Sequence, residues 1–363
     1  MKTGHATIGE LVSQLVKEKE MTRDFIVPTS DLALSVQEES QLAFTNGNAS
    51  EIFTVNENAH RQISDRLAIP YKYYERMRTE YPELLEENVN GWFRKNPEDR
   101  MVRTLGGKVR AFLSNKYRRI DNLELMQAVY PVLQEMDGVN IKSCAVTDNH
   151  LYLQVVSERV KTEIVKGDIV QAGFVISNSE TGLGAVSVQP MVYRLICANG
   201  LISAENSHRR YHTGKRVEAE ENYEIFRDET KAIDDMAYFA KVQDIVRAAV
   251  NETRFNQQVM QMEHAMGIQV DPMTVTTVVK ELGRTYTLKE AEQTAIVQNF
   301  LMGDYGTARE HIVHFNQFGL SNAVTKTANM ADDYERAIEL ERLGGTILTA
   351  NLTQLLGDMK QIA

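Results

Sequence analysis

The segment that most constrains the fold lies between residues 101 and 122. Two short runs of alternating side chains, Met101–Leu105 and Lys108–Leu113, stand on either side of a Gly-Gly pair. Such a pair predicts a β-hairpin, because the favoured two-residue turns need residues that adopt positive φ. The apolar residues that follow recur at helical spacing, with Asp121 or Asn122 in place to cap the helix. We therefore expect a hairpin and then a helix, where a mostly helical N-terminal part gives way to a sheet.

The residues after this helix alternate in the manner of strands, with polar turns between them. The expected strands are Val139–Val146, Leu151–Ser157, Ile169–Ser177, Gly184–Gln189 and Met191–Ala198. Beyond residue 218, apolar residues recur at helical spacing almost to the end of the chain. The pattern predicts an α+β fold: a central antiparallel sheet with a packed helix, a helical N-terminal part and a helical C-terminal region.

A chain of 363 residues has room for two or three domains. We place the boundaries where the pattern changes. The expected regions are a helical or mixed N-terminal region at 1–95, an α+β core with a basic hairpin and loop at 96–216, and a helical C-terminal region at 217–363.

Several protein classes are disfavoured by the sequence. No window approaches the ~18 consecutive apolar residues that a membrane span requires. The N-terminus is charged and lacks an apolar core, so we expect no secretory signal. The two cysteines, Cys144 and Cys197, are too few for a disulfide framework. These features favour a reducing, cytoplasmic location and no membrane partner.

The charges are unevenly distributed along an acidic chain. The formal net charge is −10, which argues against a uniformly basic nucleic-acid protein. Residues 94–119 nevertheless hold nine Lys or Arg and two acidic residues, and residues 206–216 hold four Lys or Arg and no acidic residue. A protein with this distribution can present a local positive surface while the rest stays acidic.

The candidate site combines these cations with aromatic rings. Lys108, Arg110 and Phe112 point to one face of their strand, because side chains alternate along a strand. Cations neutralise phosphates and rings stack on bases, a combination that suits single-stranded nucleic acid. The alternative is a solvated surface whose charges pair with the carboxylates of this acidic protein. The candidate nucleic-acid contacts are Arg103, Lys108, Arg110, Phe112, Lys116, Tyr117, Arg118, Arg119, Arg209, Arg210, Tyr211, Lys215 and Arg216.

Other kinds of site have less support. His208 and His212 have the i, i+4 spacing of metal ligands and Cys197 lies upstream, but we expect a loop there and the ligand set is incomplete. The stretch GLGAVSV is not a Gly-rich phosphate loop. Neither cysteine has the adjacent basic partner of a nucleophile. We expect no metal, no cofactor and no catalytic residue, which disfavours an enzyme without deciding the question.

Five stretches carry a resemblance to a known family. They are IPYKYYERM (Ile69–Met77), VRAFLSNKYRRIDN (Val109–Asn122), ISNSETGLGAVSV (Ile176–Val188), YRLICANGL (Tyr193–Leu201) and GLSNAVTKTA (Gly319–Ala328). On these stretches the chain resembles the family called domain of unknown function 932, whose members phages and plasmids encode. The resemblance implies a mobile-element protein in a bacterial cytoplasm, but it brings no residue roles.

The expected function is therefore binding. A basic hairpin, a helix and further antiparallel strands are similar in outline to phage single-strand annealing proteins, an analogy of fold alone. The first hypothesis is a phage or plasmid protein that binds single-stranded nucleic acid, as a homo-oligomeric annealing or recombination factor with single-stranded DNA as its partner. The alternative is a non-enzymatic, homo-oligomeric interaction or counter-defence protein that binds a host protein or a small anionic ligand. A third, an enzyme acting on nucleic acid, would need a metal.

Overall fold

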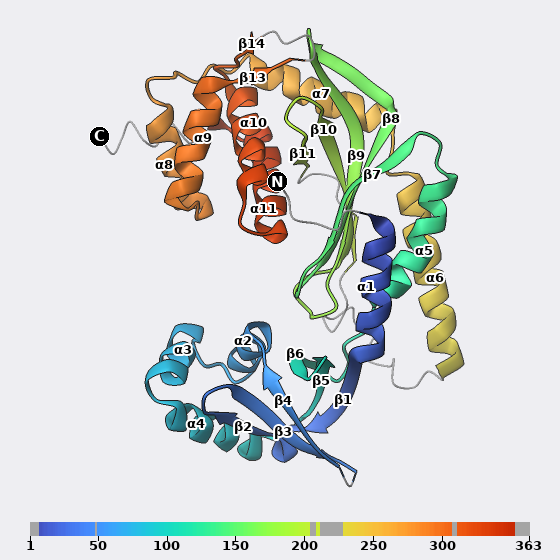
Figure 1. The fold of residues 1–363 in the computed structure, drawn as a ribbon, viewed down its shortest axis with the longest axis vertical. Helices are drawn as coiled ribbons and strands as arrows, with labels where there is room; N and C mark the ends of the chain where they lie inside the picture. Colours follow the sequence, from blue (N-terminus) through green and yellow to red (C-terminus); the bar gives the residue numbers. More distant parts are fainter. Residues whose placement is uncertain (1–6, 48, 204–207, 211–227, 307–310, 353–363) are drawn as a thin grey trace.

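The computed structural model describes residues 7–47, 49–203, 208–210, 228–306 and 311–352. Side chains are described for the same ranges except 208–210 and 228–232. The described chain contains two large sheets with helices packed on them, a small two-stranded sheet and a C-terminal group of helices, so the expected α+β class with a helical C-terminal region is confirmed (Figure 1).

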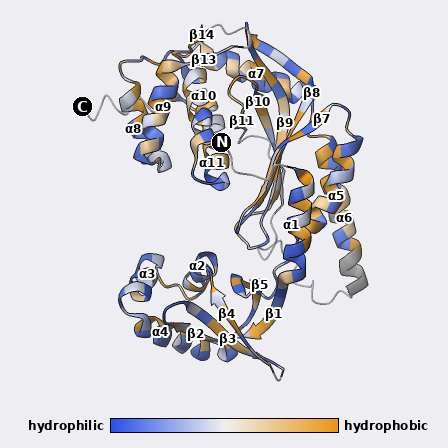
Figure 2. Ribbon diagram, in the orientation of Figure 1, coloured by the Kyte–Doolittle hydropathy of each residue, from blue (hydrophilic) through white to orange (hydrophobic). Residues whose placement is uncertain are grey.

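The first sheet has six strands in the order β1-β5-β6-β4-β3-β2. Phenylalanine and aliphatic side chains from one face of this sheet form a core with three helices. In Figure 2, hydrophobic and hydrophilic residues alternate in bands along these helices. The strands are β1 (Thr22–Pro28), β2 (Ala33–Val36), β3 (Ser40–Asn46), β4 (Ala49–Val55), β5 (Asp99–Leu105) and β6 (Lys108–Ser114). The helices are α2 (Glu57–Arg66), α3 (Tyr71–Glu80) and α4 (Pro82–Lys95), and a short 3-10 turn, η1 (Thr29–Asp31), follows β1.

The predicted hairpin is confirmed as β5 and β6. Gly106 and Gly107 form its turn with φ of 55° and 88°, values that favour glycine. The hairpin lies inside the first sheet, where β5 pairs with β1 and β6 pairs in parallel with β4. The segment before the hairpin thus supplies the other four strands of this sheet, β1 to β4. Alternation within the hairpin predicts its strands but does not identify their distant partners.

The second sheet has the order β11-β10-β9-β8-β7, with β12 paired to β10. Its strands are β7 (Val139–Val146), β8 (Leu151–Val165), β9 (Asp168–Asn178), β10 (Val186–Arg194), β11 (Asn199–Ile202) and β12 (His208–Arg210). One face packs against α1 (Ile8–Met21), α5 (Asn122–Glu135) and α6 (Asp228–Arg247). The helix expected after the hairpin is α5, and the two runs on either side of Pro190 form one strand, β10.

The C-terminal helices cover the other face of the second sheet and form a core of their own. They are α7 (Glu252–Met266), α8 (Val275–Tyr286), α9 (Glu290–Met302), α10 (Gln317–Thr327) and α11 (Tyr334–Thr349). A small hairpin of β13 (Asp304–Tyr305) and β14 (His311–Ile312) and a 3-10 turn, η3 (Ala328–Met330), connect them. Among the described residues, no helix is both long and apolar enough to cross a membrane.

Glycine allows α11 to approach the second sheet closely. A Cβ on Gly345 would lie 2.0 Å from the carbonyl oxygen of Ile202 in β11. Real side chains do not make contacts this short, so any larger residue would push the helix away from the strand. Gly91 in α4 is the matching helical glycine with nothing within 4 Å of a built Cβ.

We expect Gly345→Ala to lower the free energy of unfolding by about 1–3 kcal/mol, because overpacking displaces α11 from β11. Gly91→Ala is the control and should raise stability by about 0.5–1 kcal/mol, since alanine favours a helix and meets no neighbour there. Urea unfolding of the two variants measures both effects. The same change in the free energy of unfolding in both variants would contradict the close packing of α11.

Candidate functional site

The first basic segment, residues 94–119, lies where the two sheets meet, and much of it is buried there. Arg110 of β6 forms an ion pair with Glu180, which lies in the turn between β9 and β10. The two side chains are 7% and 11% exposed. The second oxygen of Glu180 accepts a hydrogen bond from the backbone N–H of Asn122 at 2.5 Å, at the start of α5. One carboxylate therefore connects the first sheet, the second sheet and α5.

Arg103 is buried in the same place and is fully enclosed. Its guanidinium forms an ion pair with Asp121 and lies 3.1 Å from the carboxylate of Asp24. It also donates a hydrogen bond of 3.1 Å to the backbone carbonyl of Glu180. Lys19 of α1 completes this network with an ion pair to Asp121. A buried cation needs such partners, because an unpaired charge in the interior costs several kcal/mol.

Four expected nucleic-acid contacts are thus in the interior of this structure. Arg103 and Arg110 are held by carboxylates, and Phe112 belongs to the core of the first sheet. Tyr117 is buried and donates a hydrogen bond of 3.2 Å to the carbonyl of Ser179. The expectation that Lys108, Arg110 and Phe112 present one exposed face is wrong. The register between β5 and β6 is irregular at Arg103/Thr104, and this bulge interrupts the alternation. Phe112 therefore faces the core of the first sheet, whereas Arg110 reaches Glu180.

The rest of the first segment is closer to solvent. Arg118 pairs with Asp234 and Asp235 of α6, with its side chain 14% exposed. Arg119 pairs with Asp24 at 3.1 Å and remains 57% exposed. Lys108 and Lys116 are exposed. Carboxylates therefore hold Arg118 and Arg119, as the alternative interpretation of the charges expected.

The second basic segment is described only in part. Arg209 and Arg210 lie in β12, which pairs with β10 so that Arg210 is opposite Val186. Their side chains, and the residues Tyr211, Lys215 and Arg216, lie outside the described part of the structure. The backbone register still gives the location: β12 reaches the end of β10 that follows the turn holding Ser179 and Glu180.

The two basic segments therefore approach the same end of the second sheet. Tyr117 contacts Ser179, just past the end of β9, and Lys116 is its neighbour in the chain. In the sheet, Ser177 of β9 pairs with Ser187 of β10, which in turn pairs with Arg209 of β12. Segments 90 residues apart in the sequence are thus brought to one edge by strand pairing.

A second buried polar cluster was not predicted from the sequence. Arg194 of β10 binds Asp168 at 2.6 Å and Asp304 at 2.6 Å. Asp304 also binds Lys326 of α10 at 2.6 Å and the thiol of Cys197 at 3.0 Å. Burial raises the pKa of Cys197 to about 12, so the thiol stays protonated and is no nucleophile at neutral pH.

Among the residues whose side chains are described, no three His, Cys, Asp or Glu residues are placed so that they could hold one metal ion. Cys197 binds Asp304, and His212 lies outside the described residues. The predicted lack of a metal is neither confirmed nor contradicted for the whole chain.

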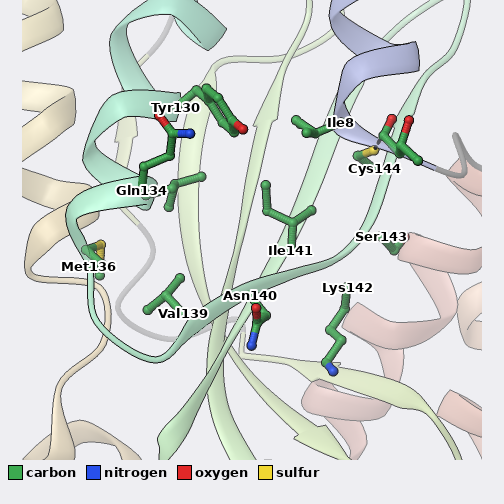
Figure 3. A pocket seen from close by; sticks show the side chains of 12 residues that line it. Ile8, Tyr130, Gln134, Met136, Val139, Asn140, Ile141, Lys142, Ser143 and Cys144 are labelled. Carbon is green, nitrogen blue, oxygen red and sulfur yellow. Dashed lines mark hydrogen bonds between the residues drawn. The ribbon is translucent and has the colours of Figure 1, made fainter.

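A cavity with a volume of about 350 Å³ lies between α1, α5 and β7 (Figure 3). Its lining mixes apolar and polar side chains, with Ile8, Tyr130 and Ile141 around the space. Lys142 is the one charged residue among its lining residues, and it points away from Ile141. The cavity therefore does not provide the basic pocket that a small anionic ligand would need.

The comparisons with known proteins identify the family. The family model described as domain of unknown function (DUF932) matches residues 111–351, more than half of the chain. The chain belongs to this family. No curated protein and no solved structure matches it.

The family match begins inside β6, so the first sheet lies almost entirely before it. Arg103 and Arg110 precede the match, whereas Asp121, Asn122 and Glu180 lie within it. Two of the five stretches that carry the resemblance, Val109–Asn122 and Ile176–Val188, meet at the joint between the sheets. Glu180 was missed because a single acid in a polar turn has no distinguishing pattern.

We expect Arg110→Met to lower the free energy of unfolding by about 3–5 kcal/mol, because it leaves the carboxylate of Glu180 buried without its cation. Arg159→Met is the matched control: Arg159 is 67% exposed and pairs with the exposed Asp137. That variant should change stability by no more than about 0.5 kcal/mol. Urea unfolding of both variants tests the difference, and similar losses would contradict a buried joint.

The joint also predicts a dependence of stability on pH. Burial alone would raise the pKa of Asp121, but Arg103 and Lys19 beside it hold this pKa below its ordinary value. The folded pKa is thus lower than the unfolded pKa of about 3.9, so the stabilisation is complete above that pH. It is lost as the pH falls through the folded pKa.

We expect Asp121→Asn to lose less of its unfolding free energy than the wild type when the pH falls from 7 to 3. Leu125→Ala, at a fully buried position, is the control, because it destabilises the protein without removing a carboxylate. This control should keep the acid sensitivity of the wild type. An Asp121→Asn profile parallel to that of the wild type would rule out the lowered pKa.

Proposed function

We propose that this protein binds single-stranded nucleic acid at the end of the second sheet where its two basic segments approach each other. The observation that supports the proposal is the strand register. β12, with Arg209 and Arg210, pairs with the part of β10 that adjoins the turn contacted by Tyr117. Cations from both segments would then neutralise consecutive phosphates of one strand.

The proposed contact set is smaller than the sequence suggested. Arg103, Arg110, Phe112 and Tyr117 hold the joint between the sheets, and Arg118 is engaged by α6. Tyr211 is the proposed ring for base stacking, which is worth about 1–3 kcal/mol per base and tolerates any sequence. The proposed phosphate contacts are Lys108, Lys116, Arg119, Arg209, Arg210, Lys215 and Arg216.

The finer form of the proposal is a homo-oligomeric annealing or recombination factor of a phage or plasmid, acting in the cytoplasm of a bacterial host. Annealing brings two strands together through their phosphates and needs no acid–base residue. Membership in the family is compatible with this role without specifying it.

We expect a labelled single strand to bind with an affinity that falls steeply as salt rises, because binding releases counterions. Arg209→Ala combined with Arg210→Ala should weaken binding and reduce the slope of log K against log salt by about 0.7 per lost contact. Arg159→Ala, at an exposed ion pair on β8, is the control and should leave both unchanged. Fluorescence anisotropy at 50 and 200 mM salt measures the affinity. Absence of binding at low salt, or binding indifferent to salt, would reject the proposal.

A further inference from the structure

A histidine and a glutamate form a hydrogen-bonded pair at the same end of the second sheet. His150 lies in the turn between β7 and β8, and Glu335 lies in the first turn of α11. The Nδ1 atom of His150 is 3.1 Å from Glu335 Oε1. Thr147 donates its hydroxyl to the same oxygen at 2.5 Å. Two residues of this turn thus fix the carboxylate and, through it, one nitrogen of the imidazole.

The plane of the imidazole is fixed as well. Its centroid is 5.4 Å from the ring of Tyr152, which stacks on Tyr334 at 5.6 Å. The hydroxyl of Tyr334 is hydrogen-bonded to Ser143 of β7. A ring held by a column of aromatic side chains and by a carboxylate has little freedom to rotate, so its second nitrogen has a defined direction.

The pairing also fixes the tautomer. Burial would raise the pKa of Glu335, but hydrogen bonds from His150 and Thr147 hold this pKa below its ordinary value, so the group is a carboxylate. A carboxylate only accepts hydrogen bonds, so Nδ1 carries the proton. In the neutral imidazole Nε2 is then an acceptor. The side chain is 20% exposed, so a ligand can reach it.

The acceptor nitrogen is directed toward the proposed nucleic-acid site. A Cβ on Gly184 would lie 3.1 Å from His150 Nε2, so this nitrogen faces the turn between β9 and β10. Val186, two residues further on, pairs with Arg210 of β12. Asn149 accepts a hydrogen bond of 3.4 Å from Thr181 in the same turn. The pair therefore adjoins the edge at which the basic segments approach.

We propose that His150 accepts a hydrogen bond from the 2′-hydroxyl of a bound strand, so that the single strand preferred by this protein is RNA. This inference rests on the function proposed above. The 2′-hydroxyl is the donor that RNA has and DNA lacks, and it belongs to the sugar-phosphate backbone that the cations hold. An acceptor placed beside a phosphate-binding edge therefore distinguishes the two polymers without reading a sequence.

The test compares three matched single strands: RNA, DNA and 2′-O-methyl RNA, which keeps the ribose oxygen but has no proton to donate. We expect the wild type to bind RNA about 2- to 10-fold more tightly than the other two, the range of one net hydrogen bond. His150→Phe keeps a ring against Tyr152 and removes the acceptor, so it should bind all three strands equally. His264→Phe on α7, at an exposed position, is the control and should keep the preference.

Glu335→Gln provides a second, independent variant, because a carboxamide can donate to Nδ1 and so release the tautomer. It should reduce the RNA preference, and thermal unfolding verifies that each variant is folded. Equal binding of RNA and DNA by the wild type, or a preference that survives His150→Phe, would overturn this inference and leave strand binding intact. Failure of every strand to bind would instead reject the proposed function.

Discussion

The contact on which the rest of the structure depends is the carboxylate of Glu180. It neutralises Arg110 in the first sheet and accepts the first free N–H of α5, while the carbonyl of the same residue accepts a hydrogen bond from Arg103. A charge withdrawn from water is tolerated only when its partners are fixed in place. The requirement works in both directions: the first sheet supplies the guanidinium groups, and the second sheet supplies the turn that satisfies them. The relative position of the two sheets follows from this mutual need.

This joint changes the meaning of the charge distribution. A basic segment in an acidic chain suggests a surface for anions, yet its most enclosed cations are used internally. What remains for a partner is the exposed part of that segment together with β12, which strand pairing brings to the same edge. The turn that holds Ser179 and Glu180 is fixed by the joint and adjoins this edge, so the proposed binding surface lies beside a preorganised part of the fold.

The sequence predicts local structure well here, and long-range pairing poorly. The Gly-Gly turn, the helix start near Asp121 and the strand Val139–Val146 are confirmed, because each depends on neighbours within a few residues. The burial of Arg103 depends on partners 18 and 77 positions away, and no periodicity reports them. His150 was missed for the same reason: the glutamate that orients it lies 185 positions further on. The sequence therefore predicts which segments are basic, but not which of their side chains are buried or what they pack against.

The family match begins inside β6. The turn between β9 and β10 that holds Glu180 therefore has some hydrogen-bond partners within the matched residues and others before them. Asn178 donates to the carbonyl of Ile120 and to the side chain of Asn122, contacts within the matched half. The carbonyl of Thr181 instead accepts from Gln62 of α2 at 2.7 Å, a residue before the match. The turn therefore closes the second sheet on α5 by one set of hydrogen bonds and receives the first sheet by another. If the matched half were separated from the first sheet, Asn178 would keep its partners, whereas Glu180 would have to be solvated by water in place of Arg110. If the matched residues stood without the first sheet, this turn would therefore lie at their surface, next to the proposed binding edge.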